Sequence, residues 1–121
     1  IVASLVGSEM CIRDRDSDVS ALLPALRRAL AERAVHPAFH PDAPMTVLSE
    51  GRSDCVILRR SRGGETLVAV HNITAARLSF RLSGLGGDLN QPWADCLSGH
   101  VFQPHQLHSL EPYAVHWLVQ P

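Results

Sequence analysis

The fold is decided by the stretch His36-Pro37-Ala38-Phe39-His40-Pro41, where the spacing of the apolar residues changes. Before this stretch, apolar residues recur every three or four positions, and after it they recur every second position. Two prolines this close together do not fit in one regular element, because each lacks an N–H and pushes the preceding residue toward extended geometry. We therefore predict a stiff hinge that joins a helix to an all-β unit.

The residues before the hinge have the pattern of an amphipathic helix, which we place at about 20–33, with Pro24 in or near its first turn. The apolar stripe of this helix consists of Val19, Leu22, Leu23, Leu26, Ala29 and Leu30. An isolated helix has nothing to cover such a stripe. We expect Leu22, Leu26 and Leu30 to be only partly covered in this chain, and the chain to self-associate through them.

The residues after the hinge alternate between apolar and polar side chains and are interrupted by turn residues. We predict strands at 45–48, 55–60, 66–71, 78–82, 93–97, 106–110 and 113–119. The continuous apolar run from Leu67 to Val70 indicates burial on both faces of its strand. Short strands at this spacing are typical of an antiparallel sandwich, so the fold class is mainly β, with one N-terminal helix and six or seven strands.

Composition narrows the possible partners. The chain has 121 residues and a net charge of −1, with Arg as its only strongly basic residue type. This balance argues against nucleic acid or an anionic membrane as the main partner. No apolar run approaches the roughly 20 residues of a membrane span. Three cysteines do not make a disulfide framework, so we expect a reducing, cytoplasmic setting.

Several segments, in this order along the chain, carry a resemblance to a known family. They are the helix with Leu26-Arg27-Arg28, then HPAFHPDAP (36–44), VAVHNIT (68–74), WADCLSG (93–99) and LEPYAVHWL (110–118). Together, over roughly 16–121, they resemble the C-terminal end of an α-amylase-family enzyme, glycoside hydrolase family 13, nearest to its sucrose-phosphorylase branch. In that family a (β/α)₈ barrel ends in its eighth helix and continues into an all-β C-terminal domain.

The resemblance implies a domain organisation and a parent activity. Residues 16–43 would be the last barrel helix and the hinge, and residues 44–121 the all-β C-terminal domain. Residues 1–15 resemble translated sequencing-adapter sequence, so Glu9 and Cys11 are given no function. The parent enzyme would transfer a glucosyl group from sucrose or a related α-glucoside to phosphate with retention. The main partner of this fragment would be the missing barrel.

The resemblance brings no active site to this chain. Retaining glycosidases need a facing pair of carboxylates, and in this family those residues lie on barrel strands upstream of the last helix. The carboxylates present are Glu9, Asp14, Asp16, Asp18, Glu32, Asp42, Glu50, Asp54, Glu65, Asp88, Asp95 and Glu111, mostly at positions typical of caps and turns. We therefore predict no catalytic, cofactor-binding or metal-binding residue, no cofactor, and no activity for the fragment alone.

Four other groups of residues have both a functional and a structural interpretation. Cys96, His100, His105 and His108 are candidate zinc ligands, but Cys96 has no C-x₂₋₄-C partner, so a buried cysteine beside loop histidines is favoured. His36 and His40 are four apart, but Pro37 breaks the helix that would align them. Asn72-Ile73-Thr74 is a glycosylation sequon that matters only in a secreted protein. Trp93, Tyr113 and Trp117 suit a sugar-stacking platform, yet core packing is favoured.

Three classes of function follow from these observations. The preferred class is a non-catalytic C-terminal piece of a carbohydrate-active enzyme. The second is a free-standing carbohydrate-binding β-sandwich, and the third is a small zinc-binding protein. The helix separates the first two classes, because a free-standing module has no need of an unpaired Leu-rich helix.

Overall fold

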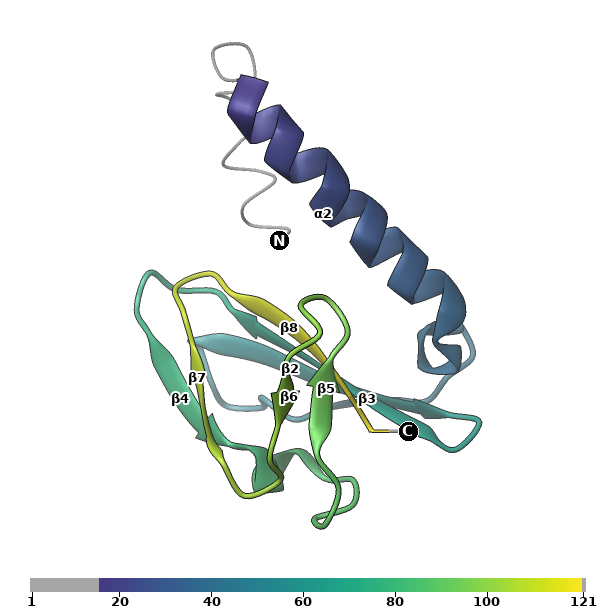
Figure 1. Ribbon diagram of the computed structural model, residues 1–121. Helices are drawn as coiled ribbons and strands as arrows, with labels where there is room; N and C mark the ends of the chain where they lie inside the picture. Colours follow the sequence, from purple (N-terminus) through teal and green to yellow (C-terminus); the bar gives the residue numbers. More distant parts are fainter. Residues whose placement is uncertain (1–15, 121) are drawn as a thin grey trace.

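The computed structural model describes residues 16–120, with side chains from Ser20 onward. The interpretation of residues 1–15 therefore lies outside the described residues. Helix α2 (Asp16–Val35) leads into a single 3₁₀ turn, η2 (Pro37–Phe39), within the predicted hinge. Figure 1 shows that the chain passes from the C-terminal end of α2 into the β-part, and that the other end of the helix lies away from the strands. No helix among these residues is long and apolar enough to cross a membrane.

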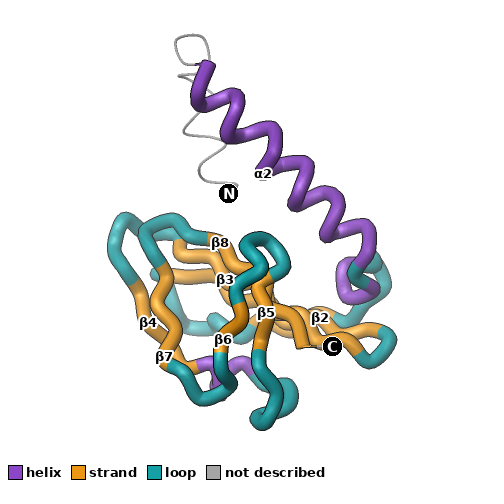
Figure 2. Tube along the Cα trace, viewed as in Figure 1, coloured by secondary structure: helices purple, strands orange, loops and turns teal. Residues whose placement is uncertain are grey.

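The rest of the described chain is an antiparallel sandwich, which confirms the predicted fold class. Its strands are β1 (Met45–Val47), β2 (Cys55–Arg62), β3 (Glu65–Asn72), β4 (Leu78–Arg81), β5 (Trp93–Asp95), β6 (Val101–Phe102), β7 (Leu107–Leu110) and β8 (Val115–Gln120), with a 3₁₀ turn η3 (Leu82–Leu85) after β4. Six strands form one sheet in the order β1-β2-β3-β8-β5-β6, and β4 pairs with β7 in a second sheet. Figure 2 shows these strands gathered into one body.

The boundaries differ from the prediction at several points, each with a local cause. The helix is longer than 20–33, and Pro24 lies inside it rather than in its first turn, because strong helix formers surround it. Strand β5 ends at Asp95, whose carboxylate accepts hydrogen bonds from Leu97 N and Ser98 Oγ and so builds a turn. Tyr113 lies before the last strand, at φ 57°. The unpredicted strand is the two-residue β6.

Strand β3 is buried on both faces, as its apolar run predicts. Val68 and Val70 lie in the main core between the two sheets, which also contains Cys55, Ile57, Leu82, Leu85, Trp93, Leu110 and Leu118. Leu67 and Ala69 point to the opposite face, where they pack with Ala38 of the hinge, Phe39 and Trp117. The ring centroids of Phe39 and Trp117 are 4.8 Å apart. The hinge is thus anchored on the outer face of the large sheet.

Helix α2 is mostly exposed. Among its described side chains Ala29 is the one that is buried, whereas Leu23, Leu26, Leu30 and Val35 are exposed by 38% to 70%. Leu22 is half-buried. These values match the expectation that the apolar stripe is only partly covered in this chain.

Candidate functional site

The densest group of charged side chains lies where α2 meets the sheet. Glu32 and His36 are one helical turn apart, so their side chains lie on the same side of the helix end. His36 Nε2 is 3.0 Å from Glu32 Oε2, and His36 Nδ1 is 2.9 Å from Glu65 Oε2 on β3. The other oxygen of Glu65 accepts the backbone N–H of Ala38 at 3.4 Å. One imidazole therefore links the helix end to the sheet through two carboxylates.

Two further side chains complete this group. Arg28 forms an ion pair with Glu32, with Nε 3.0 Å from Oε1. Nε and Nη2 of the same guanidinium donate to the carbonyl oxygen of Cys96 at 3.1 Å and 2.8 Å. The Cys96 thiol donates to the carbonyl oxygen of Trp117 at 3.3 Å. The donor atoms of Glu32, His36 and Cys96 all lie within 4.8 Å of one another, and all three side chains are half-buried. We call Arg28, Glu32, His36, Glu65 and Cys96 the junction cluster.

The protonation of the junction cluster follows from its contacts. Burial opposes a charge on His36, but hydrogen bonds to Glu65 and Glu32 outweigh burial and raise the pKa of His36 above its ordinary 6.5. Burial, with the negative charges of Glu32 and Asp95 nearby, raises the pKa of Cys96 to about 12. In this structure the cluster therefore favours an imidazolium between two carboxylates beside a neutral thiol.

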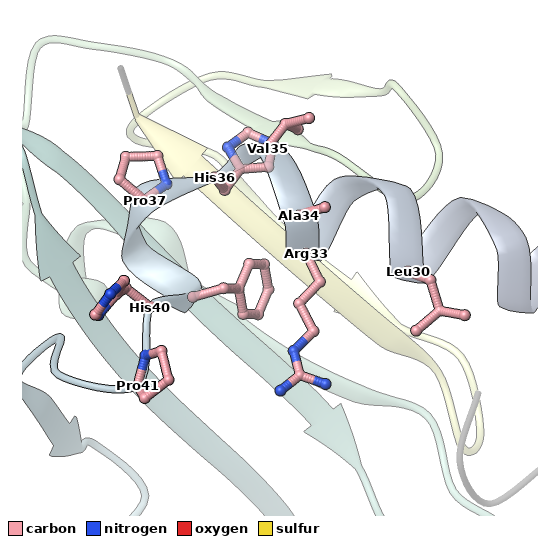
Figure 3. Close-up of a pocket in the computed structure, with 9 residues that line it drawn as sticks. Leu30, Arg33, Ala34, Val35, His36, Pro37, His40 and Pro41 are labelled. Atoms are coloured by element: carbon pink, nitrogen blue, oxygen red, sulfur yellow. The ribbon is translucent and has the colours of Figure 1, made fainter.

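A hollow of about 510 Å³ lies next to the cluster, between the last turns of α2 and the hinge (Figure 3). It is lined by Leu30, Arg33, Ala34, Val35, His36, Pro37, Phe39, His40 and Pro41. None of these residues is Asp or Glu, so the hollow lacks the facing carboxylates that glycoside hydrolysis needs. The carboxylates of the junction cluster are already engaged with His36 and Arg28.

The four candidate zinc ligands predicted from the sequence do not come together. Within the described residues, one group of His, Cys, Asp or Glu side chains has metal-ligand spacing. It consists of Glu32, His36 and Cys96, so it contains Cys96 but none of the three histidines. His108 is 2% exposed and lies inside the sandwich, with its Nε2 3.1 Å from Nδ1 of His116. His100 and His105 are exposed.

The remaining candidates have structural roles. Trp93 lies in the main core, Trp117 packs on the hinge, and Tyr113 is exposed in a turn, so these three aromatics share no platform. Asn72 is 2% exposed, and its Nδ2 donates to the carbonyl oxygens of Ala76 and Glu111. The nitrogen that would carry a glycan thus holds the turn after β3 together.

The sequence pattern suggested a pair of His36 with His40, whereas in the structure His36 pairs with Glu32. The i, i+4 spacing of an acid and a histidine in the last helical turn was the available signal. His40 instead contacts Arg62 and accepts the backbone N–H of Asp42. Glu65 carried no local signal, because its role depends on the position of the β2–β3 hairpin.

Comparison with known proteins shows which solved structures share the fold of this chain. The sequence matches no family model and no curated protein. The structure is similar to AmyP, solved in complex with maltose, with a TM-score of 0.74 at 19% identity over 88% of this chain. It is also similar to an α-amylase from Anoxybacillus, described as a new glycosyl hydrolase subclass, with a TM-score of 0.70 at 18% identity over 82% of this chain.

The chain shares its fold with a part of these enzymes. It spans 22% of the length of each of them. A putative α-N-acetylgalactosaminidase from Bacillus halodurans is similar over 89% of this chain, with a TM-score of 0.52 at 19% identity, and there the chain spans 26% of the length. Residues 36–121 make up about seven tenths of the chain. A match over 88% therefore includes part of α2 as well as the sandwich.

Proposed function

We propose that this chain is the last barrel helix and the non-catalytic C-terminal β-domain of an α-amylase-family enzyme. The observation that carries the proposal is the exposed apolar face of α2, formed by Leu23, Leu26 and Leu30, on a helix joined directly to the sandwich. A face of this kind needs a partner, and a (β/α)₈ barrel provides one for its outer helices. The similarity to AmyP, which extends into the helix, supports the same arrangement.

The parent activity we propose is transfer of a glucosyl group from sucrose or a related α-glucoside to phosphate. Its support is the order of segments 36–44, 68–74, 93–99 and 110–118, which resembles the sucrose-phosphorylase branch. Retention at the anomeric carbon needs a carboxylate nucleophile and a second carboxyl about 5 Å away. Barrel enzymes build such a cleft at the C-terminal ends of their strands. We propose a cytoplasmic location, in keeping with the free thiols of Cys55 and Cys96.

The experiment compares two proteins in one assay, the phosphate-dependent formation of glucose 1-phosphate from sucrose. The 121-residue chain alone should form none, and the same residues behind their own barrel, expressed from the full reading frame, should be active. In the longer protein, replacing Leu26 and Leu30 by Gln should lower activity by disturbing helix packing, whereas replacing exposed Arg27 by Gln should not. Activity in the 121-residue chain, abolished by changing one of its own carboxylates, would contradict the proposal.

The alternative is a free-standing carbohydrate-binding sandwich. The AmyP complex with maltose makes maltose the natural probe. We expect no maltose binding by this chain in calorimetry, because its aromatic residues form no platform. Saturable binding of maltose by the chain alone would favour the alternative.

A further inference from the structure

The junction cluster contains three different donor types at metal-ligand spacing. A carboxylate oxygen from Glu32, an imidazole nitrogen from His36 and a sulfur from Cys96 lie within 4.8 Å of one another. They come from α2, the hinge and the segment after β5, which the fold brings together. A mixed O, N and S donor set is typical of Zn²⁺ and unlike the all-oxygen sets that Mg²⁺ and Ca²⁺ prefer.

The spacing of these donors is close to that of a bound ion. With bonds of about 2.0–2.3 Å, two ligands of a tetrahedral Zn²⁺ lie about 3.3–3.6 Å apart. Glu32 Oε2 and His36 Nε2 are 3.0 Å apart, so an ion between them needs only a small opening of the pair. The sulfur of Cys96 lies within 4.8 Å of both of these atoms, so it has to move closer to them when an ion binds.

The side chains around the three donors are also arranged like those that surround the ligands of a bound metal ion. Glu65 holds Nδ1 of His36 at 2.9 Å, which leaves Nε2 pointing at Glu32. Histidines that bind zinc usually donate their second ring N–H to a carboxylate in this way. Arg28 binds the outer oxygen of Glu32, Oε1, so Oε2 stays directed toward His36 (His36 is drawn in Figure 3).

We propose that Glu32, His36 and Cys96 form a Zn²⁺ site, with Glu65 as the residue that positions His36 and solvent in the fourth coordination place. On binding, the thiol of Cys96 and Nε2 of His36 each release one proton to solvent, while Nδ1 keeps its proton toward Glu65. The ion replaces the hydrogen bond between Glu32 and His36 and ties α2 to the β-part. This proposal departs from our sequence-based expectation that the chain has no metal-binding residue, which considered Cys96 only with the histidines that follow it. The proposed site uses residues that precede it, and it does not depend on the proposed enzymatic role.

The test is a titration of the full chain with Co²⁺, a spectroscopic substitute for Zn²⁺. One equivalent should give a near-ultraviolet thiolate-to-Co²⁺ charge-transfer band and the intense visible bands of a tetrahedral ion, and Zn²⁺ should remove both. Zn²⁺ should also raise the thermal midpoint in proportion to the logarithm of its free concentration. Absence of the charge-transfer band with stoichiometric Co²⁺ would overturn the proposal.

Variants separate the ligands from the positioning residue. Cys96→Ser should abolish the charge-transfer band, and Glu65→Gln should keep the band but weaken the affinity about 10- to 100-fold. Cys11→Ser and His105→Gln are matched controls that should leave both band and affinity unchanged. Survival of the band in Cys96→Ser, or its loss in Cys11→Ser, would contradict the assignment. If Cys96→Ser does not fold by circular dichroism, Glu32→Gln serves instead and should weaken binding.

Discussion

The chain should lose stability in acid through one buried histidine, His108. This residue is 2% exposed on β7, and its ring packs edge-on against Phe102 and Phe80 at centroid distances of 4.2 Å and 5.1 Å. Its Nε2 is 3.1 Å from Nδ1 of His116 on β8. In the neutral pair, one ring donates the hydrogen bond and the other accepts it. When both rings are protonated, two donors face each other.

The expected loss follows from the pKa of His108. Burial, together with the neighbouring His116, lowers this pKa from 6.5 to about 4, and Asp95 opposes the change. A histidine whose pKa is lowered by folding contributes its full stabilisation above its unfolded pKa and loses it as the pH falls toward its folded pKa. With an unfolded pKa of about 6.5, the free energy of unfolding should fall by about 2 kcal/mol at pH 5 and about 3 kcal/mol at pH 4 from this residue alone.

The measurement is urea unfolding of the wild type and of His108→Gln, followed by tryptophan fluorescence between pH 7.5 and pH 4. The Gln variant keeps a polar partner for His116 but does not titrate, so it should be less stable at pH 7.5 and lose less stability on acidification. Exposed His105→Gln is the control and should show the pH profile of the wild type. Equal pH dependence in His108→Gln and the wild type would refute the reasoning.

Two further predictions concern the helix and a tight turn. The wild-type chain should self-associate through the exposed face of α2. In sedimentation velocity, the double change Leu26→Gln, Leu30→Gln should shift the chain toward the monomer, whereas Arg27→Gln should not. A monomeric wild type with a folded helix would count against a missing partner. Gly87→Ala should destabilise more than Gly64→Ala in thermal unfolding, by about 1–3 kcal/mol. Both glycines have positive φ, but only at Gly87 does a Cβ meet atoms, with Gln120 Oε1 at 2.3 Å and Trp93 at 3.1 Å. Gln120 cannot move freely because it bonds Asp88 and Gln91. Equal effects of the two substitutions would contradict this account.

Much of the fold could be predicted from the sequence because it depends on local periodicity. The change of period at His36–Pro41 located the hinge, and the run Leu67–Val70 indicated a strand buried on both faces. The exposed apolar stripe of α2 could also be predicted from the sequence, because a lone helix has no other element to cover its apolar side chains. The errors occurred where one side chain sets a boundary, as at Asp95, whose carboxylate builds the turn that ends β5.

The candidate site could not be predicted in the same way, because its residues lie far apart in the sequence. His36 and Glu65 are 29 residues apart, and Arg28 and Cys96 are 68 residues apart. Proximity in the sequence grouped Cys96 with His100, His105 and His108, yet His108 faces the sandwich core while Cys96 lies on the outer face with the hinge. Only the pairing of β5 with β8, and the packing of the hinge against β3 and β8, brings Cys96 toward Glu32 and His36. Periodicity thus determined which elements form and which faces are apolar, whereas the proximity of chemical groups was decided by strand order and register, because these are set by contacts between residues far apart in the chain.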